Sequence, residues 1–492
     1  MPKISHILIL LSTGVTVFLV FSAIKSGVLY QYDVDELAHT QFVYLIAKGF
    51  MPYTSFHMIF TPLFYWFQIP LYNTLGFNFH TIYIMRLVMS GLFIVRIVFS
   101  FLFIKNIFGK KVALFFVPLL LLDPFTVFSG FQIRPDNLMV PLFVLGLLFL
   151  SYALKKRSNT LFFLSGLIFS LSSLVLIKIV PEIAVIIILF AVYSYKNKKQ
   201  RDFLLFLSAF PIPWIFLFIY FALQGGLFDL FRNIFFYAFL NNQTILNVTP
   251  VTFYYHPNNY YLFGTMGLSL NWAYIYVIHT LAALGVCLIL WEIKRNIRIF
   301  SADVLIRIIT VAVCIVLTVW VFTVRGVFLQ YFLPLSWLLA LFSGVSLVYF
   351  LEFIEKKTSK GYVFLLLIYF VAFILFAFSS IKGNQARAGI GNEKIIKGHE
   401  DAWNFIQGNE ATFPNELFRP PGYPLTYGTF IGDVNPYILR NWGKVEDHLE
   451  KKKVKYVFKD DYLWMYLDAN TKKYIDKHYL PSSHSEILVR KD

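Results

Sequence analysis

Long apolar runs dominate the sequence and determine its fold class. They extend from near the N-terminus to about residue 380, and many approach the roughly 20 residues that an α-helix needs to cross a bilayer. Hydrophobic residues make up 58% of the chain and charged residues 14%, whereas a soluble domain has about 25% charged residues. The sequence therefore predicts an α-helical polytopic membrane protein and excludes an ordinary soluble one.

About eleven crossings fit these runs. Their approximate positions are 6–24, 82–104, 112–128, 137–154, 160–177, 180–195, 203–223, 272–291, 307–323, 330–350 and 362–380. Lys178, Pro181 and Glu182 interrupt one apolar stretch that a single long helix would also fit, and that alternative reverses the orientation of everything after it. The first run, preceded by Lys3, also has features of a signal peptide, although no small-residue cleavage site precedes Lys25.

Short basic clusters between the apolar runs predict the orientation. They are Lys105, Lys110 and Lys111; Lys155, Lys156 and Arg157; Lys196, Lys198, Lys199 and Arg201; Lys294, Arg295, Arg298 and Arg307; and Lys356, Lys357 and Lys360. Loops rich in Lys and Arg remain cytoplasmic, so we expect a plasma-membrane protein with a cytoplasmic N-terminus and a C-terminus outside. The net charge of +16 thus reflects topology, and we expect no nucleic-acid partner.

Two domains are predicted, a membrane domain over residues 1–380 and an extracytoplasmic domain over 381–492. The membrane domain carries outer loops at 25–81, 129–136 and 224–271, and the segments 25–81 and 224–271, like the tail from about 381, are too long for simple connectors and can hold a functional site. The last segment has 17 basic and 15 acidic residues, the turn-rich run RPPGYPLTYG and a strand candidate over Val454–Phe458. This composition predicts a small mixed α/β domain. Cys287 and Cys314 both lie in apolar runs, which argues against a disulfide framework or a cysteine metal site.

The first outer loop carries an unusual density of polar residues. Its sequence YDVDELAHT supplies Asp33, Asp35, Glu36 and His39. Alternatively, these acids cap a helix that begins near Glu36, because an Asp at the N-cap accepts hydrogen bonds from backbone N–H groups. The loop then returns to apolar, aromatic sequence that includes Tyr53 and His57, so we expect these polar groups to face a pocket at the membrane surface.

A second outer loop, SGFQIRPDN, brings Arg134 and Asp136 to the same side of the membrane. The two residues form either a satisfied ion pair or part of a site with the first-loop acids, in which one carboxylate acts as general base. Basic residues on the outer side suit an anionic phosphate or, alternatively, lipid headgroups reached by snorkelling. These basic residues are Arg86, Arg134, Lys178, Arg232 and Arg325. Arg96 is predicted inside the second span, where a charge needs a partner or a cavity.

These motifs resemble those of the GT-C membrane glycosyltransferases, in particular the branch that contains protein O-mannosyltransferases and the aminoarabinose transferases that modify lipid A. The resemblance is strongest over residues 30–140. The similar features, in chain order, are Asp35 and Glu36; Gly49, Pro52 and Tyr53; Pro62, Leu63 and Tyr65; Arg134, Pro135 and Asp136; and the run RGVFLQYFLP from Arg325 to Pro334. The chain departs from the branch at FHMIFTPL, where the lipid A enzymes carry a Lys before the Pro-Pro-Leu segment.

The resemblance implies transfer of a sugar from a polyprenyl-phosphate donor to a lipid, glycan or protein acceptor outside the membrane. In that reaction Asp35 is the general base of an inverting attack, and Glu36 and Asp136 orient the acceptor or tune the base. Arg134, Lys178, Arg325 and Arg86 are candidates to bind the donor phosphate. Asp33, His39, Tyr53 and His57 are candidates to line the pocket. Carboxylates and a phosphate suit Mg²⁺, but the resemblance implies no metal or other cofactor.

Three other functions fit a chain with many spans and charges near the membrane. A transporter or flippase of lipid-linked sugars predicts acids at mid-membrane depth and repeated halves, whereas nearly all acids here lie in loops and no repeat is evident. A polymerase or ligase of surface polysaccharide uses similar chemistry on different substrates. A non-catalytic assembly protein would make the loop acids incidental.

Overall fold

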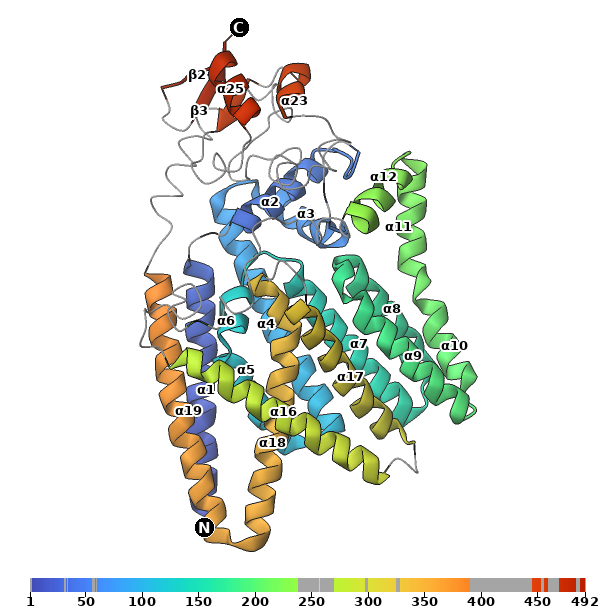
Figure 1. The fold of residues 1–492 in the computed structure, drawn as a ribbon, viewed down its shortest axis with the longest axis vertical. Coiled ribbons are helices and arrows are strands. Elements are labelled where there is room, and N and C mark those ends of the chain that lie inside the picture. The colour runs from blue at the N-terminus through green and yellow to red at the C-terminus, as the bar shows by residue number, and fades with distance from the viewer. Residues whose placement is uncertain are drawn as a thin grey trace. The chain divides into compact units, whose positions relative to one another are not determined.

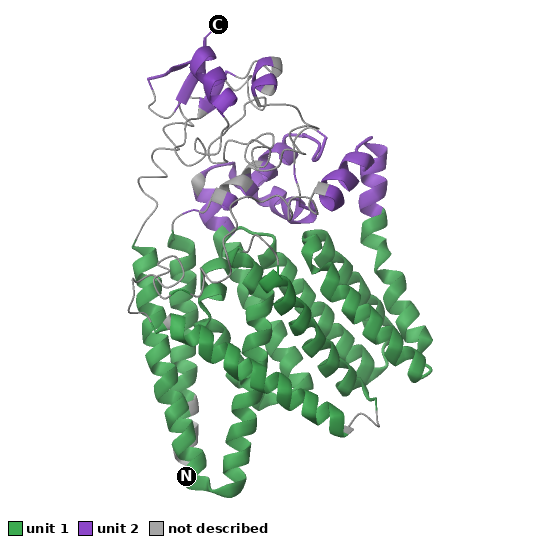
Figure 2. Cartoon of the chain, viewed as in Figure 1, with its two compact units in different colours: residues 1–30, 86–215, 249–390 green, residues 31–85, 216–248, 391–492 purple. Residues whose placement is uncertain are grey.

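The computed structural model describes residues 2–30, 32, 34–54, 58, 60–237, 256, 270–296, 300–323, 328–389, 445–452, 455–458, 469–483 and 487–491. The described chain forms two compact units (Figure 2). Unit 1 comprises residues 1–30, 86–215 and 249–390, and unit 2 comprises residues 31–85, 216–248 and 391–492. The chain passes from one unit to the other within helices α4 (Phe79–Ile107) and α11 (Pro211–Leu223).

Unit 1 is a bundle of long apolar helices (Figure 1). In addition to parts of α4 and α11, it contains α1 (Pro2–Leu29), α5 (Lys110–Leu122), α6 (Pro124–Ser129), α7 (Asp136–Lys156), α8 (Asn159–Val175), α9 (Val180–Lys196), α10 (Gln200–Ala209), α16 (Asn271–Asn296), α17 (Ala302–Thr323), α18 (Phe332–Lys357) and α19 (Ser359–Ala388). Short 3₁₀ turns η1 (Ile177–Ile179) and η3 (Leu329–Tyr331) precede α9 and α18.

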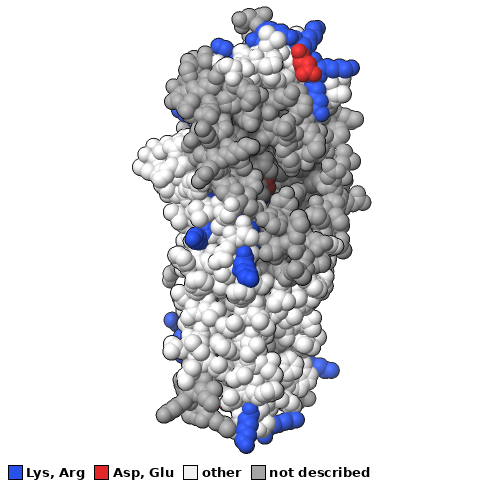
Figure 3. Space-filling view, turned by 90° about the vertical axis from the view of Figure 1, so that its left-hand side faces the viewer, with Lys and Arg blue, Asp and Glu red and all other residues white. Residues whose placement is uncertain are grey.

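Each of the eleven predicted spans contains a helix in the structure. Among the described residues, nine helical segments are long and apolar enough to cross a membrane. The other two predicted spans, at 112–128 and 160–177, correspond to shorter helices, α5 with α6 and α8. The protein is therefore a multi-pass α-helical membrane protein. On the face drawn in Figure 3, uncharged residues cover most of the described surface, as expected for helices in contact with lipid.

Two breaks divide helices where polar residues or prolines interrupt the apolar sequence. The stretch around Lys178 forms two helices, α8 and α9, separated by η1, so the alternative of one long helix is wrong. Asp123 ends α5 and caps α6, where its Oδ2 accepts a hydrogen bond from the Thr126 N–H at 2.7 Å. Pro124 at the first position of α6 suits that start, because proline has no N–H to leave unsatisfied there.

Small and hydroxylated residues allow the helices of unit 1 to approach closely. A Cβ at Gly166 would lie 2.0 Å from the Phe206 carbonyl oxygen, and one at Gly285 would lie 2.0 Å from that of Phe342. Ser343 donates a hydrogen bond of 2.9 Å to the Ile278 carbonyl, which joins α18 to α16. Such contacts replace the hydrophobic effect, which does not drive helix association within lipid. The first helix joins this bundle, since α1 packs along α19 and Asn384 donates a hydrogen bond to Ser22.

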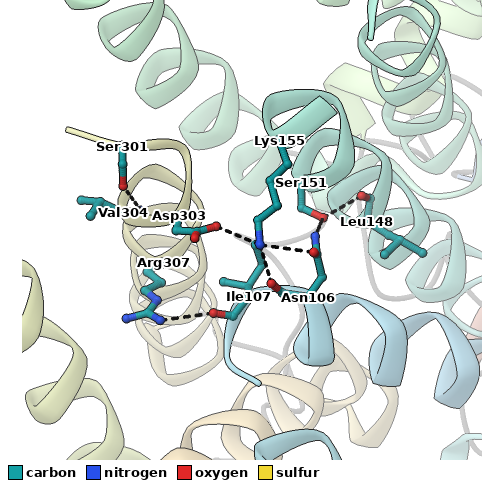
Figure 4. A network of polar contacts seen from close by, with 9 residues as sticks. All are labelled: Asn106, Ile107, Leu148, Ser151, Lys155, Ser301, Asp303, Val304 and Arg307. Atoms are coloured by element: carbon teal, nitrogen blue, oxygen red, sulfur yellow. Dashed lines mark hydrogen bonds and ion pairs between the residues drawn. The ribbon is translucent and has the colours of Figure 1, made fainter. Parts of the chain in front are cut away.

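A polar network joins three helices of unit 1 at the end predicted to face the cytoplasm (Figure 4). Lys155 Nζ on α7 lies 3.1 Å from Asp303 Oδ1 on α17 and donates to the Asn106 carbonyl on α4. Asn106 in turn donates to Ser151 Oγ at 2.9 Å. Lys155, a member of one of the basic clusters that predict the orientation, thus also connects α7 with α4 and α17.

Unit 2 contains the helices α2 (Val34–Ala47), α3 (Leu63–Leu75) and α12 (Leu227–Phe231) and the π-helical turn η2 (Arg232–Tyr237). It also contains a small α/β part with α23 (Val445–Lys452), α25 (Ala469–His478), β1 (Tyr456–Phe458), β2 (Tyr479–Pro481) and β3 (Ile487–Arg490). The three strands form an antiparallel sheet in the order β1–β3–β2, with Val457 opposite Leu488 and Leu480 opposite Val489. This sheet confirms the predicted α/β character of the C-terminal segment and its strand candidate.

Candidate active site

The predicted site residues that the structure describes fall into two groups, one in each unit. Asp35, Glu36, His39 and Tyr53 belong to unit 2, and Arg86, Arg134, Asp136 and Lys178 belong to unit 1. Asp33, His57 and Arg325 lie outside the described residues, and their predicted roles remain predictions.

Helix α2 places the first-loop acids at its N-terminus. Asp35 and Glu36 occupy its first turn, where a negative charge is favoured by the unsatisfied N–H groups of the helix end. Glu36, His39 and Thr40 follow at helical spacing and are buried, whereas Asp35 is half-buried. Asp35, Glu36, His39 and Thr40 therefore lie on one face of α2.

His39 lies among aromatic side chains and meets one tyrosine hydroxyl. Its Nδ1 is 2.9 Å from Tyr65 Oη on α3, and its ring is 3% exposed. The ring centroid lies 5.2 Å from that of Phe60 and 5.8 Å from that of Phe64, both at steep interplanar angles. This aromatic packing excludes water from the His39–Tyr65 contact.

A second tyrosine of α3 makes the equivalent contact one residue further along α2. Tyr72 Oη lies 3.1 Å from Thr40 Oγ1, and Thr40 also donates to the Glu36 carbonyl at 3.0 Å. Burial raises the pKa of the Tyr72 phenol far above its usual value, and the charge of Glu36 raises it further. The Tyr72 hydroxyl is thus a permanently protonated group.

The same physical causes act on Tyr65. Burial raises its pKa well above the ordinary value for a phenol, and the charges of Tyr53 and Asp35 raise it further. Tyr65 is fully buried. The effect of Asp35 on this pKa indicates that the carboxylate and the phenol are close enough to interact electrostatically. Unit 2 therefore places the carboxylate of Asp35, the imidazole of His39 and the phenol of Tyr53 around Tyr65.

Tyr53 lies in the loop between α2 and α3 and has a backbone conformation that bulky residues rarely adopt. Its backbone φ is 70°, in the left-handed region, and Gly49 before it has a φ of 86°. The buried ring of Tyr53 packs on Phe221 with centroids 5.3 Å apart, and its hydroxyl donates to the Phe60 carbonyl at 2.7 Å. These contacts offset the cost of the backbone conformation, and such strain is typical of functional sites.

In unit 1, Lys178 and Asp136 form a buried ion pair between η1 and the first turn of α7. Lys178 Nζ also lies 4.4 Å from the centroid of the Tyr331 ring, a cation–π contact. The charges of Arg134 and Glu182 both act on Lys178. This cluster brings charged groups of the 129–136 loop together with Lys178, and it adds Glu182 and Tyr331 to the predicted residues.

Arg134 is also buried and has a defined orientation. Its Nε donates to Gln132 Oε1 at 2.7 Å within the same loop. Asn137 fixes the loop by donating to the carbonyls of Ser129 and Gln132, both at 2.8 Å. The loop is thus a rigid support for Arg134 and Asp136.

The two remaining arginines of α4 have different surroundings. Arg86 is fully buried and donates hydrogen bonds to the carbonyls of Val28 and Tyr30 at the end of α1, so these contacts give it a structural role. Arg96 is 1% exposed, lies 5.2 Å from the Phe93 ring centroid and interacts electrostatically with Asp123. Within the described part of the chain, no hydrogen-bond acceptor meets any of its three guanidinium nitrogens.

Within the described ranges, no group of three or more His, Cys, Asp or Glu side chains has the arrangement of a metal site. The structure also shows what sequence reasoning missed, namely Tyr65 and Tyr72 as partners of the first-loop helix and Glu182 beside Lys178. One signal for the tyrosines was available. They are seven residues apart, which places them on one face of α3. Asp35 and His39, four residues apart, likewise share one face of α2.

Comparison with known proteins agrees with this architecture. The family described as dolichyl-phosphate-mannose-protein mannosyltransferase matches residues 60–222, a segment that includes Tyr65, Arg134, Asp136 and Lys178. A search of curated protein sequences finds no match. The chain is similar to the ArnT structure from Cupriavidus metallidurans bound to undecaprenyl phosphate, with 14% identity and a TM-score of 0.55 over 98% of this chain and 97% of that one.

It is also similar to the archaeal oligosaccharyltransferase AglB from Archaeoglobus fulgidus, in complex with an inhibitory peptide and a dolichol-phosphate. The identity is 12% and the TM-score 0.56, over 98% of this chain and 74% of AglB. The protein therefore has the GT-C fold of the membrane glycosyltransferases, as the resemblance implied.

Proposed function

We propose that this protein is a membrane glycosyltransferase that moves a sugar from a polyprenyl-phosphate donor to an acceptor on the outer face of the membrane. The observation that carries the proposal is the position of Asp35 and Glu36 within the GT-C fold, in the first turn of the helix that directly follows the first apolar helix. The similar ArnT and AglB structures, which hold undecaprenyl phosphate and a dolichol-phosphate, support this class of donor.

The reaction is an inverting displacement. Asp35 accepts the proton of an acceptor hydroxyl while that oxygen attacks the anomeric carbon from the face opposite the phosphate. The new glycosidic bond forms as the bond between that carbon and the phosphate oxygen breaks, and the electron pair leaves with the polyprenyl phosphate. Glu36 and Asp136 orient the acceptor or tune the base.

Cationic groups stabilise the charge that grows on the leaving phosphate. Arg134 is buried and Lys178 is partly buried in unit 1, and a cation removed from water acts on a nearby charge more strongly than one in water. Arg325 is proposed to assist them, as the sequence pattern indicates. The reaction needs no metal in this scheme, because these side chains supply the positive charge.

The orientation follows the basic clusters, with the N-terminus in the cytoplasm and the C-terminal α/β domain outside the plasma membrane. The acceptor is a lipid, a glycan or a protein. Asp35 acts on a hydroxyl group, which all three acceptor classes carry.

The proposal is tested by mass spectrometry of polyprenyl-phosphate sugars and surface glycans in cells that lack the protein. We expect a lipid-linked sugar to accumulate and a glycan or other acceptor to lose the corresponding mass. Wild type should restore both and Asp35→Asn should restore neither. Asp229→Asn is the matched control, because Asp229 is an acid of the same unit that pairs with Arg232 at 2.8 Å. Full complementation by Asp35→Asn would refute the base assignment.

A further inference from the structure

Glu182 is a buried acid that the proposed reaction does not use. It is 1% exposed, whereas the two residues before it at the start of α9, Val180 and Pro181, are exposed. Apolar residues thus face the surroundings at this end of the helix, while the carboxylate is turned into unit 1. The N-terminus of α9 favours a negative charge, but an exposed acid would gain the same benefit, so the helix end does not explain the burial. A carboxylate buried in a membrane helix bundle is costly and typical of a functional site.

Glu182 lies one helical turn after Lys178. The turn η1 continues directly into α9, so residues 177–196 form one helical segment. Side chains four residues apart on a helix are neighbours, with Cβ atoms about 5–6 Å apart. Lys178 itself is engaged elsewhere, because its Nζ pairs with Asp136 and lies 4.4 Å from the centroid of the Tyr331 ring.

One oxygen of the Glu182 carboxylate is therefore left over. Its Oε2 is buried and has no hydrogen-bond partner among the described residues. The large majority of buried side-chain polar atoms in native proteins do have a partner, because an unsatisfied one costs free energy. The unused oxygen of Glu182 thus indicates a hydrogen-bond donor that arrives with a ligand.

The chemistry of a carboxylate selects the kind of ligand. A carboxylate accepts hydrogen bonds, so its ligand must supply O–H or N–H groups. The phosphate of the proposed donor is an anion and supplies none, whereas the sugar carries several hydroxyl groups. One oxygen joins the sugar to the phosphate. A carboxylate one turn from the lysine that is proposed to act on the phosphate is thus placed to reach the sugar ring.

We propose that Glu182 is a specificity-determining residue, which accepts a hydrogen bond from a hydroxyl group of the donor sugar while Lys178 contacts the phosphate. This inference deepens the proposed function and rests on it for the identity of the ligand. The Lys178 side chain is 16% exposed, so the two residues can be reached from that side. A site of this kind rejects an analogue that lacks the hydroxyl, because the buried acid is then left without a partner.

The test measures binding of the donor without any transfer. The full-length protein in detergent is titrated, by native mass spectrometry, with undecaprenyl phosphate and with a panel of undecaprenyl-phosphate monosaccharides. Glu182→Gln keeps the size of the side chain and removes its charge. We expect the Kd of the preferred sugar-bearing lipid to rise about tenfold or more, the effect of losing a hydrogen bond to a charged group. The Kd of undecaprenyl phosphate should not rise, because loss of a negative charge does not weaken the binding of an anion.

Monodeoxy analogues of the preferred lipid identify the hydroxyl group. Removal of the hydroxyl that contacts Glu182 should weaken binding to wild type and have little further effect in Glu182→Gln, so the two changes are not additive. Glu182→Met removes the carboxyl group altogether and should weaken binding of the sugar-bearing lipid at least as much. Glu352→Gln is the matched control, because Glu352 is a half-exposed acid of unit 1 that pairs with Lys111 at 3.0 Å. It should leave both Kd values unchanged.

An equal rise in the Kd of both kinds of lipid in Glu182→Gln would show that Glu182 only supports the fold, and it would overturn the proposal. An unchanged Kd for the sugar-bearing lipid would do the same, as would additive effects of Glu182→Gln and the deoxy analogues. Failure of every sugar-bearing lipid to bind wild type would overturn both this inference and the proposed function. If binding behaves as expected but Asp35→Asn keeps full transfer activity, the sugar contact stands and the proposed reaction fails.

Discussion

Lys178 and Asp136 form an ion pair in which the Asp136 side chain is 4% exposed and the Lys178 side chain 16%. Removal of one member leaves the other charge buried without its partner, which costs about 3–5 kcal/mol. Lys178→Met should therefore lower the free energy of unfolding by roughly that amount, measured by thermal unfolding in detergent. Lys196→Met, at the end of the following helix α9, replaces an exposed lysine and should have little effect.

The double variant Lys178→Met with Asp136→Asn separates stability from function. It should recover much of the lost stability, because no charge remains unpaired, yet it should not recover sugar transfer. Recovery of transfer would contradict the proposed role of Lys178 at the donor phosphate.

The network of Figure 4 predicts that Lys155 contributes more to the stability of the protein than Asp303 does. Lys155 contacts both Asp303 and Asn106, whereas the Asp303 side chain is 51% exposed. A partly exposed ion pair contributes about 0.2–1 kcal/mol. Lys155→Met should thus destabilise the protein more than Asp303→Asn, and a double-mutant cycle should give a coupling within that range. A larger loss from Asp303→Asn would contradict the arrangement.

Arg86 and Arg96 offer a contrast within one helix. Arg86 donates to two carbonyls, so Arg86→Met should destabilise the protein by about 3 kcal/mol through lost hydrogen bonds from a charged group. Arg96 makes no hydrogen bond among the described residues and interacts with Asp123 only electrostatically, so Arg96→Met should destabilise the protein less than Arg86→Met, because no hydrogen bond from the guanidinium is lost. Equal destabilisation by both substitutions in unfolding experiments would show that Arg96 has a partner.

The C-terminal α/β part contains a pH-sensitive contact between Glu450 on α23, Tyr474 on α25 and Arg490 on β3. Hydrogen bonds from Tyr474 and Arg490 hold the pKa of Glu450 below its usual value, and burial together with Glu450 raises the pKa of Tyr474 to about 12. Because the folded-state pKa of Glu450 is lowered, its contribution to stability is present above the unfolded-state value of about 4.3 and is lost as the pH falls through the lower folded-state value.

Hydrogen exchange of β3 and α23 should therefore accelerate in Glu450→Gln at pH 7, where the wild-type contact is intact. The difference between the two proteins should disappear in acid. A difference that persists at a pH below the folded-state pKa would contradict the assignment.

The sequence predicted the membrane class and the position of every long helix, because burial in lipid leaves an unmistakable apolar pattern. It also identified the break at Lys178, where charge and proline interrupt that pattern. Asp123 was harder to anticipate, since a single acid within an apolar run suits either a buried side chain or a cap. Its role as a cap depends on the hydrogen bond that its carboxylate accepts from the Thr126 N–H.

The candidate site was predictable only in part. Asp35, Glu36 and His39 stand out because charge is rare in this chain, and their spacing already implies one helix face. Tyr65 was noted only as part of a motif, and Tyr72 does not stand out among 30 tyrosines, because their contacts arise from the packing of α2 on α3. Contacts between segments distant in sequence are set by tertiary packing, and local pattern does not encode them.

Release of polyprenyl phosphate by the purified protein tests the central claim most directly. The protein is reconstituted in liposomes with a panel of undecaprenyl-phosphate monosaccharides, with water or a short-chain alcohol as acceptor. We predict that wild type and Asp229→Asn release undecaprenyl phosphate from at least one donor, with inversion at the anomeric carbon, and that folded Asp35→Asn does not. Equal release by Asp35→Asn, or movement of intact donors across the bilayer without release, would contradict the account.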